Sequence, residues 1–212
     1  GSKSLFTNSS GLFNTAVGAA SLQDNNGSNN VAIGDGALGH VINANNSVGV
    51  GAYTGLYSGT GNVFIGFEAG YNEKGDRKLY ISDSLDKTLI YGDFSTGQVL
   101  IGNANPVGYQ FKGKRKLNVI GGILTDSIRI KAPFTSWADY VFEDNYRLMP
   151  VNELENYIKN EKHLPNIPST KDVLENGIDM ATMNAKLLEK IEELHLYIIQ
   201  LQKKVDFLME KK

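Results

Sequence analysis

A short phrase is repeated four times between residues 14 and 66, and its spacing constrains the fold more than any other feature of the chain. Each copy begins with Asn, ends with Gly and carries Val or Ile immediately before that Gly. Successive asparagines are 16, 15 and 17 residues apart. A period this short and regular is typical of a solenoid, in which each repeat forms one coil. The repeat positions are Asn14, Gly18, Asn30, Gly34, Asn45, Gly49, Asn62 and Gly66.

The repeat predicts a parallel β-roll or β-solenoid over residues 5–75. Asn at a fixed place is expected to form a ladder of side-chain amides, and Gly to supply a positive φ at the corner. A flexible Gly/Asn/Ser linker is the alternative, but a linker does not keep Val or Ile before every Gly. A narrow coil buries little by itself, so the coils must stack and associate with other chains. The inward line of apolar side chains is predicted to be Val17, Ile33, Val48 and Ile65.

Composition divides the chain into zones. Of 23 glycines, 22 lie at or before Gly122, whereas all five prolines follow residue 105. The net charge of −2 gives no reason to expect a nucleic-acid partner, and no apolar run approaches the roughly 20 residues of a membrane span. The absence of Cys excludes disulfides, thiol catalysis and Cys-type zinc sites. Gly1 and Ser2 look like a cloning remnant, so the chain is expected to be the C-terminal piece of a longer protein.

The phrase Asn-x-[Ala/Ser/Phe]-[Val/Ile]-Gly resembles the head repeat of trimeric autotransporter adhesins over roughly residues 10–72. That resemblance implies a left-handed parallel β-roll with three chains packed about one axis. The copy lengths vary more here than in that family, and its outer-membrane anchoring is not carried over.

Residues 76–131 are predicted to form a β-rich shaft. Apolar runs bounded by Gly, Asp and Ser are typical of short strands. Their continuous apolar character predicts strands that are covered on both faces, as a three-chain assembly would provide. The predicted strands are 78–82, 87–91, 98–101, 116–120 and 127–130.

Residues 132–178 are predicted to be a small connector that contains helices. A helix is expected from Asn152, with Glu155 completing a capping box, to about Lys162. A second, short helix is expected to begin at Ser169 and to end at Gly177, a residue typical of helix C-termini.

A trimeric coiled coil is predicted for residues 179–212, because apolar residues follow a heptad pattern there. β-Branched residues at a with Leu at d favour a parallel dimer. However, Leu188 and Met209 at e, with Met183 and Tyr197 at g, widen the apolar stripe and favour three strands. We therefore predict a parallel homotrimer. The seam consists of Asn184, Ile191, Ile198 and Val205 at a, and Leu187, Leu194, Leu201 and Leu208 at d.

Residues 114–204 resemble the C-terminal region of tail-fibre proteins of Bacteroidetes and their phages. The resemblance rests on the runs 137–142, 164–169, 177–179 and 183–194. It implies an extracellular location on a virion or injection particle. Related fibre proteins can end in a chaperone that cleaves itself at Ser-Asp-x-Arg-Leu-Lys; here Ser136 is followed by Trp137, so no self-cleavage is expected.

No catalytic, cofactor or metal site is predicted. His40, His163 and His195 lie in different zones, and no HExxH or GxSxG motif is present. His163 and His195 are expected to be solvated, and only His40 is kept as a candidate ligand contact. The chain is therefore not expected to be an enzyme.

The predicted function is a trimeric extracellular fibre or adhesin, of phage-tail or contractile-injection type, that presents a receptor-binding surface to a cell-surface glycan or protein. A baseplate or an upstream fibre segment is a further candidate partner. Two alternatives remain open: a structural spacer or trimerisation module, and a β-solenoid enzyme acting on polysaccharides through Asp24 or Asp35. Exposed rings suit sugar stacking, although packing between coils or chains is the more common role of such rings. The candidate ligand contacts are Tyr53, Tyr57, Phe67 and Tyr71.

Overall fold

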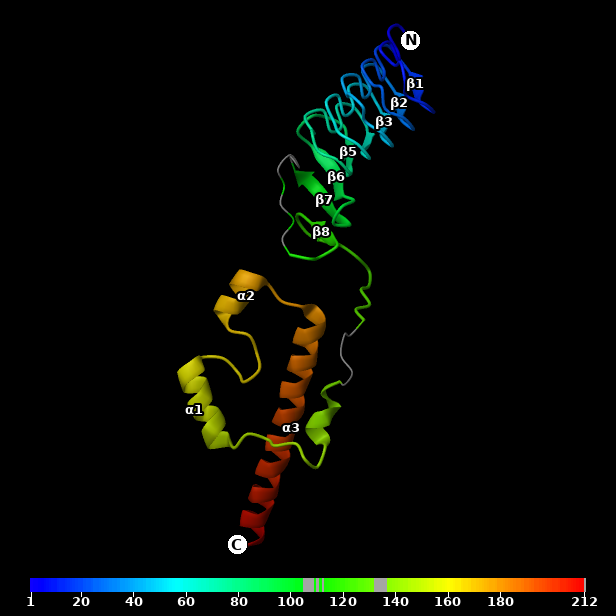
Figure 1. The fold of residues 1–212 in the computed structure, drawn as a ribbon. Helices are drawn as coiled ribbons and strands as arrows, with labels where there is room; N and C mark the ends of the chain where they lie inside the picture. Colours follow the sequence, from blue (N-terminus) through cyan, green and yellow to red (C-terminus); the bar gives the residue numbers. More distant parts are fainter. Residues whose placement is uncertain (105–108, 110, 112, 132–136, 212) are drawn as a thin grey trace. The chain divides into compact units, whose positions relative to one another are not determined.

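The computed structural model describes residues 1–104, 109, 111, 113–131 and 137–211 (Figure 1). The chain forms two compact units, Gly1–Leu124 and Thr125–Lys212. Each unit is considered by itself.

The first unit is a β-solenoid of about six turns, as the repeat predicts. Its eight strands form one sheet in sequence order. Strands β1 to β5 pair in parallel, β5, β6 and β7 pair antiparallel, and β8 returns to a parallel pairing with β7. The strands are β1 (Thr15–Val17), β2 (Val31–Ile33), β3 (Val48–Val50), β4 (Val63–Ile65), β5 (Lys78–Ser82), β6 (Thr88–Asp93), β7 (Gln98–Ala104) and β8 (Leu117–Val119).

The third repeat lies two residues away from its predicted register. Gly49 pairs with Ala32 and Phe64 in the middle of the strands, so it is not the corner glycine, and Asn45 does not start the repeat. Ser47 takes the place of the repeat Asn, and the true spacings are 16, 17 and 15 residues. The segment Ser47–Gly51 contains two Val-Gly pairs, Val48-Gly49 and Val50-Gly51. Because Asn45 lies four residues before Gly49, the first pair was assigned to the repeat in place of the second.

The repeat asparagines form a ladder through the backbone. Asn30 Oδ1 accepts a hydrogen bond from the Ser47 backbone N–H at 2.9 Å, and Asn62 Oδ1 accepts one from Lys78 N–H at 2.7 Å. Asn14 Oδ1 accepts from both the backbone and the side-chain amide of Asn30, at 3.0 and 3.1 Å. Each side chain thus caps an N–H group of the next coil, which would otherwise be buried without a partner.

The predicted inward line is wrong. Val17, Ile33 and Ile65 are exposed, Val48 is only partly buried, and the inward residues are the middle ones of each strand, such as Ala32. The core is narrow because leucines from the turns already fill it, and Leu22 and Leu38 are completely buried. A Cβ atom on Gly49 would lie 3.0 Å from Leu38 Cγ. The strand residue that faces the core must therefore be small in these coils.

The later coils fill the core with aromatic rings from the strands. The ring centroids of Phe64 and Tyr80 are 5.6 Å apart, and those of Tyr80 and Tyr91 are 5.1 Å apart. Buried Leu100 extends this core into β7. The interior thus changes from turn leucines to strand aromatics along the solenoid.

The second unit is helical. It contains the short 3-10 helix η1 (Ala138–Phe142), α1 (Val151–Glu161), α2 (Thr170–Asn176) and α3 (Met180–Glu210). The predicted strand at 127–130 is absent, because these residues are exposed and pair with no strand.

The helix ends match the sequence signals in part. Helix α1 begins after Pro150 and has no side-chain cap, so the capping box predicted at Asn152 is wrong. A capping box is present on α2, between Ser169 and Asp172, and α2 ends at Gly177 as predicted. Asp179 caps α3 by accepting a hydrogen bond from the Thr182 N–H at 2.8 Å.

Candidate functional site

A first column of exposed and partly exposed side chains runs across the turns of successive coils. His40 Nδ1 lies 2.7 Å from Asp24 Oδ2, and the hydrogen bond lowers the pKa of Asp24. The His40 ring stacks on Tyr57 with centroids 5.7 Å apart and planes 20° apart. Tyr57 in turn meets Tyr71 edge to face at 6.1 Å. The column therefore joins one carboxylate, one imidazole and two phenol rings.

A second column lies on the same turns. The Tyr53 hydroxyl donates a hydrogen bond to Asp35 Oδ2 at 2.8 Å, which raises the pKa of Tyr53. The Tyr53 ring meets Phe67 edge to face, with centroids 6.4 Å apart. We call the two columns together the aromatic surface: Asp24, His40, Tyr57, Tyr71, Asp35, Tyr53 and Phe67.

Regular backbone contacts between coils position these rings. The Tyr53 N–H donates to the Asp35 carbonyl at 2.8 Å, and the His40 N–H donates to the Leu56 carbonyl at 3.0 Å. Stacked coils place equivalent residues about 4.8 Å apart, so side chains at equivalent corners contact each other. The structure thus brings together in pairs the four aromatic residues that were selected from the sequence.

The two acidic partners of the aromatic surface were not recognised as such from the sequence. Asp24 and His40 are separated by 16 residues, and Asp35 and Tyr53 by 18. Two residues about one coil apart in the sequence can be assigned as a contact only when the register of the coils is known. Exposed rings beside hydrogen-bonding carboxylates offer an apolar face and a polar rim, which is the combination that polar ring-shaped ligands need.

The outward face of the eight-stranded sheet is almost entirely aliphatic. Side chains alternate between the two faces of a strand, and the strand register places the outward residues in two columns. Val17 is 55% exposed and Leu117 is 56% exposed. We call this surface the aliphatic face. Its columns are Val17, Ile33, Val50, Ile65, Ile81, Ile90, Ile101 and Val119, and Thr15, Val31, Val48, Val63, Leu79, Gly92, Val99 and Leu117.

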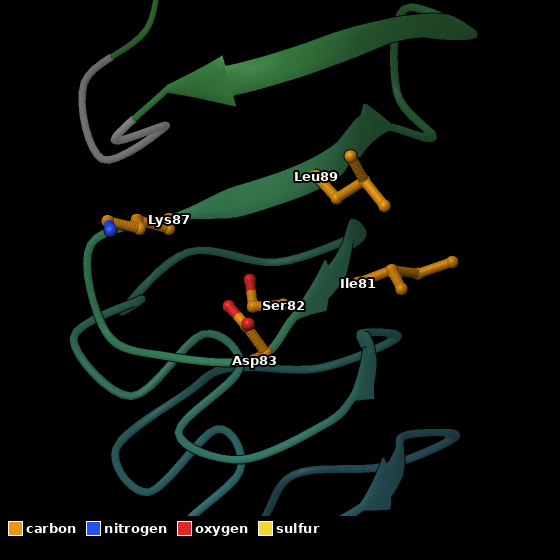
Figure 2. Close-up of a pocket in the computed structure, with 5 residues that line it drawn as sticks. All are labelled: Ile81, Ser82, Asp83, Lys87 and Leu89. Atoms are coloured by element: carbon orange, nitrogen blue, oxygen red, sulfur yellow. The ribbon is translucent and has the colours of Figure 1, made fainter.

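A hollow of about 420 Å³ lies on β5, β6 and the turn between them. Figure 2 shows Ile81 and Leu89 pointing to the same side from these neighbouring strands. The register of the two strands shifts here, so that Ile81 pairs with Ile90 and leaves Leu89 protruding. The Ser82 hydroxyl is hydrogen-bonded to Thr88 Oγ1 at 2.8 Å. The hollow therefore combines the aliphatic side chains of Ile81 and Leu89 with three polar residues, Ser82, Asp83 and Lys87.

The polar side of α3 is covered around Glu189 and Glu192, whereas its apolar side is exposed. Glu189 and Glu192 are buried, and Glu189 accepts hydrogen bonds from Tyr140, Lys190 and Asn166. By contrast, the predicted seam is open along the whole helix. The exposed seam residues are Asn184, Leu187, Ile191, Leu194, Ile198, Leu201, Val205 and Leu208.

The other two histidines contact backbone carbonyls rather than carboxylates. No group of three or more His, Asp or Glu side chains that could hold a metal ion occurs in the described part of the chain. His195 and His163 lie near backbone carbonyls, at 2.7 and 2.9 Å. No helix within the described ranges combines the length and apolarity needed to cross a bilayer.

Comparison of the chain with protein-family models, with curated proteins and with solved structures finds no match.

Proposed function

We propose that this chain is part of a homotrimeric extracellular fibre that presents the aromatic surface to a glycan or protein receptor on a cell. The observation that carries the proposal is that one chain leaves both an eight-stranded aliphatic face and a heptad seam uncovered. Soluble monomers rarely expose contiguous apolar patches of this extent, and such patches mark association surfaces.

Association of identical chains covers both surfaces at once. The aliphatic face repeats the same apolar residue types coil after coil, so identical faces from several copies can be buried together around a common axis. The seam on α3 has the spacing at which parallel helices interlock. Three copies suit the seam best, since apolar residues at e and g flank it.

The aromatic surface stays available in such an assembly. Its residues come from the turns that follow the strands, whereas the aliphatic face belongs to the strands. Burying the sheets against one another thus leaves the rings of Tyr57 and Phe67 exposed to a ligand.

Multi-angle light scattering tests the assembly. The chain has a mass of 23.2 kDa, and a trimer has three times that mass. A monomer at micromolar concentration would contradict the proposal.

Binding to a glycan array and to whole cells tests the receptor function. Tyr57→Ala and Phe67→Ala should each weaken binding by tenfold or more, because stacking on an aromatic ring contributes about 1–3 kcal/mol in comparable ligand contacts. Phe94→Ala is the matched control, since Phe94 is equally exposed but lies outside the aromatic surface.

A structural spacer is the second candidate function. It is favoured by the contacts of the rings with one another across coils, which can serve to stiffen the solenoid. A trimer that binds no glycan or cell, and in which Tyr57→Ala lowers the melting temperature, would support the spacer function.

A further inference from the structure

Hydrogen bonds on both sides of α1 join its flanking segments to α3, but no residue of α1 between them is buried. Before α1, the Met149 carbonyl accepts a hydrogen bond from the Tyr197 hydroxyl. After α1, the Asn166 amide donates one to Glu189 at 3.2 Å. No residue of α1 is buried, although the helix is amphipathic. The apolar side of α1 carries Val151, Leu154 and Ile158.

The space between α1 and α3 contains two open, apolar hollows that follow one another along α3. The first, of about 370 Å³, lies beside Leu164, Ile191 and Leu194. The second, of about 460 Å³, lies beside Val151 and Leu201. Seam residues therefore line both hollows, and whatever occupies the seam also closes this space.

The hollows lie along one particular edge of the seam. In the heptad that places Ile191 at a, the α3 residues Lys190, Tyr197 and Lys204 occupy g positions, and all three line the hollows. In a parallel three-stranded coil, the g edge of one helix adjoins the e edge of the next helix. The wall that is missing from this space is therefore the e edge of a second α3.

The opposite edge of α3 carries apolar side chains outside the a and d positions. Ile199, at b, is 49% exposed, and Leu188, at e, is partly exposed. Both lie on the side of α3 that would face the α1 of the adjoining copy. An apolar residue outside the a and d positions is accounted for when another helix covers it.

We propose that α1 of each copy lies in the outer groove between its own α3 and the α3 of a neighbouring copy, where Val151, Leu154 and Ile158 cover Ile199 and Leu188 of that neighbour. This inference rests on the proposed trimer and goes beyond it, because it makes α1 an intersubunit clamp. The two hydrogen bonds that flank α1 hold it beside the hollows that line α3.

Cysteine cross-linking tests the clamp, since the full chain has no Cys of its own. The variant Val151→Cys/Ile199→Cys is treated with a short bis-maleimide and separated on a denaturing gel. We expect most of the protein to run as a covalent trimer, because each copy is then linked to the next around the axis. The control Asn160→Cys/Ile199→Cys, with the first thiol on the opposite side of α1, should yield mainly uncross-linked chains.

The outcomes separate the clamp from the trimer. A trimer by light scattering without intersubunit cross-links, or with links confined to one chain by peptide mass spectrometry, overturns the clamp and leaves the trimer intact. A monomer by light scattering overturns both. A second variant, Leu154→Asp, should reduce the trimeric fraction at micromolar concentration, whereas Glu155→Ala should not. An unchanged trimeric fraction for Leu154→Asp would also contradict the clamp.

Discussion

The ring of Phe64 fills the space that a side chain at Gly55 would need, because a Cβ atom on Gly55 would lie 2.4 Å from Phe64 Cδ2. The reverse arrangement occurs one coil earlier, where Leu38 fills the core over Gly49. Gly55 and Leu38 have nearly the same φ, 51° and 50°, both in the left-handed region. A large side chain that fills the core therefore comes either from the corner, as Leu38 does, or from the strand, as Phe64 does.

The exchange of the core-filling side chain between the corner and the strand predicts the behaviour of two variants and of their combination. Phe64→Ala should cost about 3–5 kcal/mol, as large-to-small changes in cores do. Gly55→Leu alone should also destabilise, because it overpacks a filled core. Phe64→Ala/Gly55→Leu should be more stable than either single variant, because it recreates the Leu38 arrangement.

Urea unfolding at one fixed protein concentration measures these differences, since the proposed association would contribute to stability. Gly122→Ala is the control, because a Cβ atom there meets no atom within 4 Å. Strictly additive effects of Phe64→Ala and Gly55→Leu would refute the exchange.

The buried asparagine ladder predicts a second stability effect. Asn30→Ala leaves the Ser47 N–H and the Ala44 carbonyl without their partners, which are now bound at 2.9 and 2.7 Å. Unsatisfied buried groups cost about 1–3 kcal/mol each. Asn72→Ala, at an exposed site, should change stability by no more than about 0.5 kcal/mol. Equal unfolding midpoints for the Asn30 and Asn72 variants would contradict the structural role of the ladder.

The sequence predicted that the chain forms stacked coils, but it did not predict which strand residues face the core. The period of the phrase specified stacked coils, because Asn, Val or Ile, and Gly recur together. The inward line was not predictable from hydrophobicity, since Ala32 and Gly49 face the core while Ile33 faces outward. The deciding factor is the volume already occupied by Leu38, which comes from a different segment of the coil.

In the helical unit, the heptad pattern located α3 and its seam. It did not reveal that Tyr140 and Tyr146 bind the glutamates on the opposite side of that helix, at separations of 49 and 47 residues. Likewise, Asp24 and His40 of the aromatic surface meet only after coiling. Contacts between distant positions follow from register, and a single sequence specifies register poorly where Gly-containing phrases overlap.

Glu192 predicts a pH dependence of stability. Burial, and to a lesser degree the charge of Asp139, raise the pKa of Glu192 above its ordinary value of 4.5. Below pH 4.5 the Glu192 carboxyl is protonated in both the folded and unfolded states, so its burial costs little free energy. As the pH rises past 4.5 the unfolded state loses the proton first, so the folded state loses stability until the pH passes the raised pKa. Glu192→Gln should therefore raise the melting temperature more at pH 8 than at pH 4.

Glu189 is the matched control and should behave in the opposite way. Burial opposes ionisation, but hydrogen bonds from Lys190, Tyr140 and Asn166 outweigh it and lower the pKa of Glu189. Its charge thus stabilises the fold above the unfolded pKa and is lost as the pH falls through the lowered folded pKa. Glu189→Gln should lower the melting temperature at pH 8 and have less effect in acid. The same pH trend in both variants would show that these local causes are not responsible.

The aliphatic face predicts that single charges on it disrupt assembly independently of α3. Ile65 lies in the middle of one outward column, so Ile65→Asp would place a carboxylate where an aliphatic surface is covered. Removing the burial of one Ile forfeits about 1.5–3 kcal/mol, and burying an unpaired charge adds to this cost. Sedimentation velocity should show a loss of trimer for Ile65→Asp but not for Ile42→Asp, because Ile42 is exposed in a turn outside the sheet. If Ile65→Asp stays fully trimeric, the aliphatic face is not an interface between copies, and α3 alone holds the assembly together.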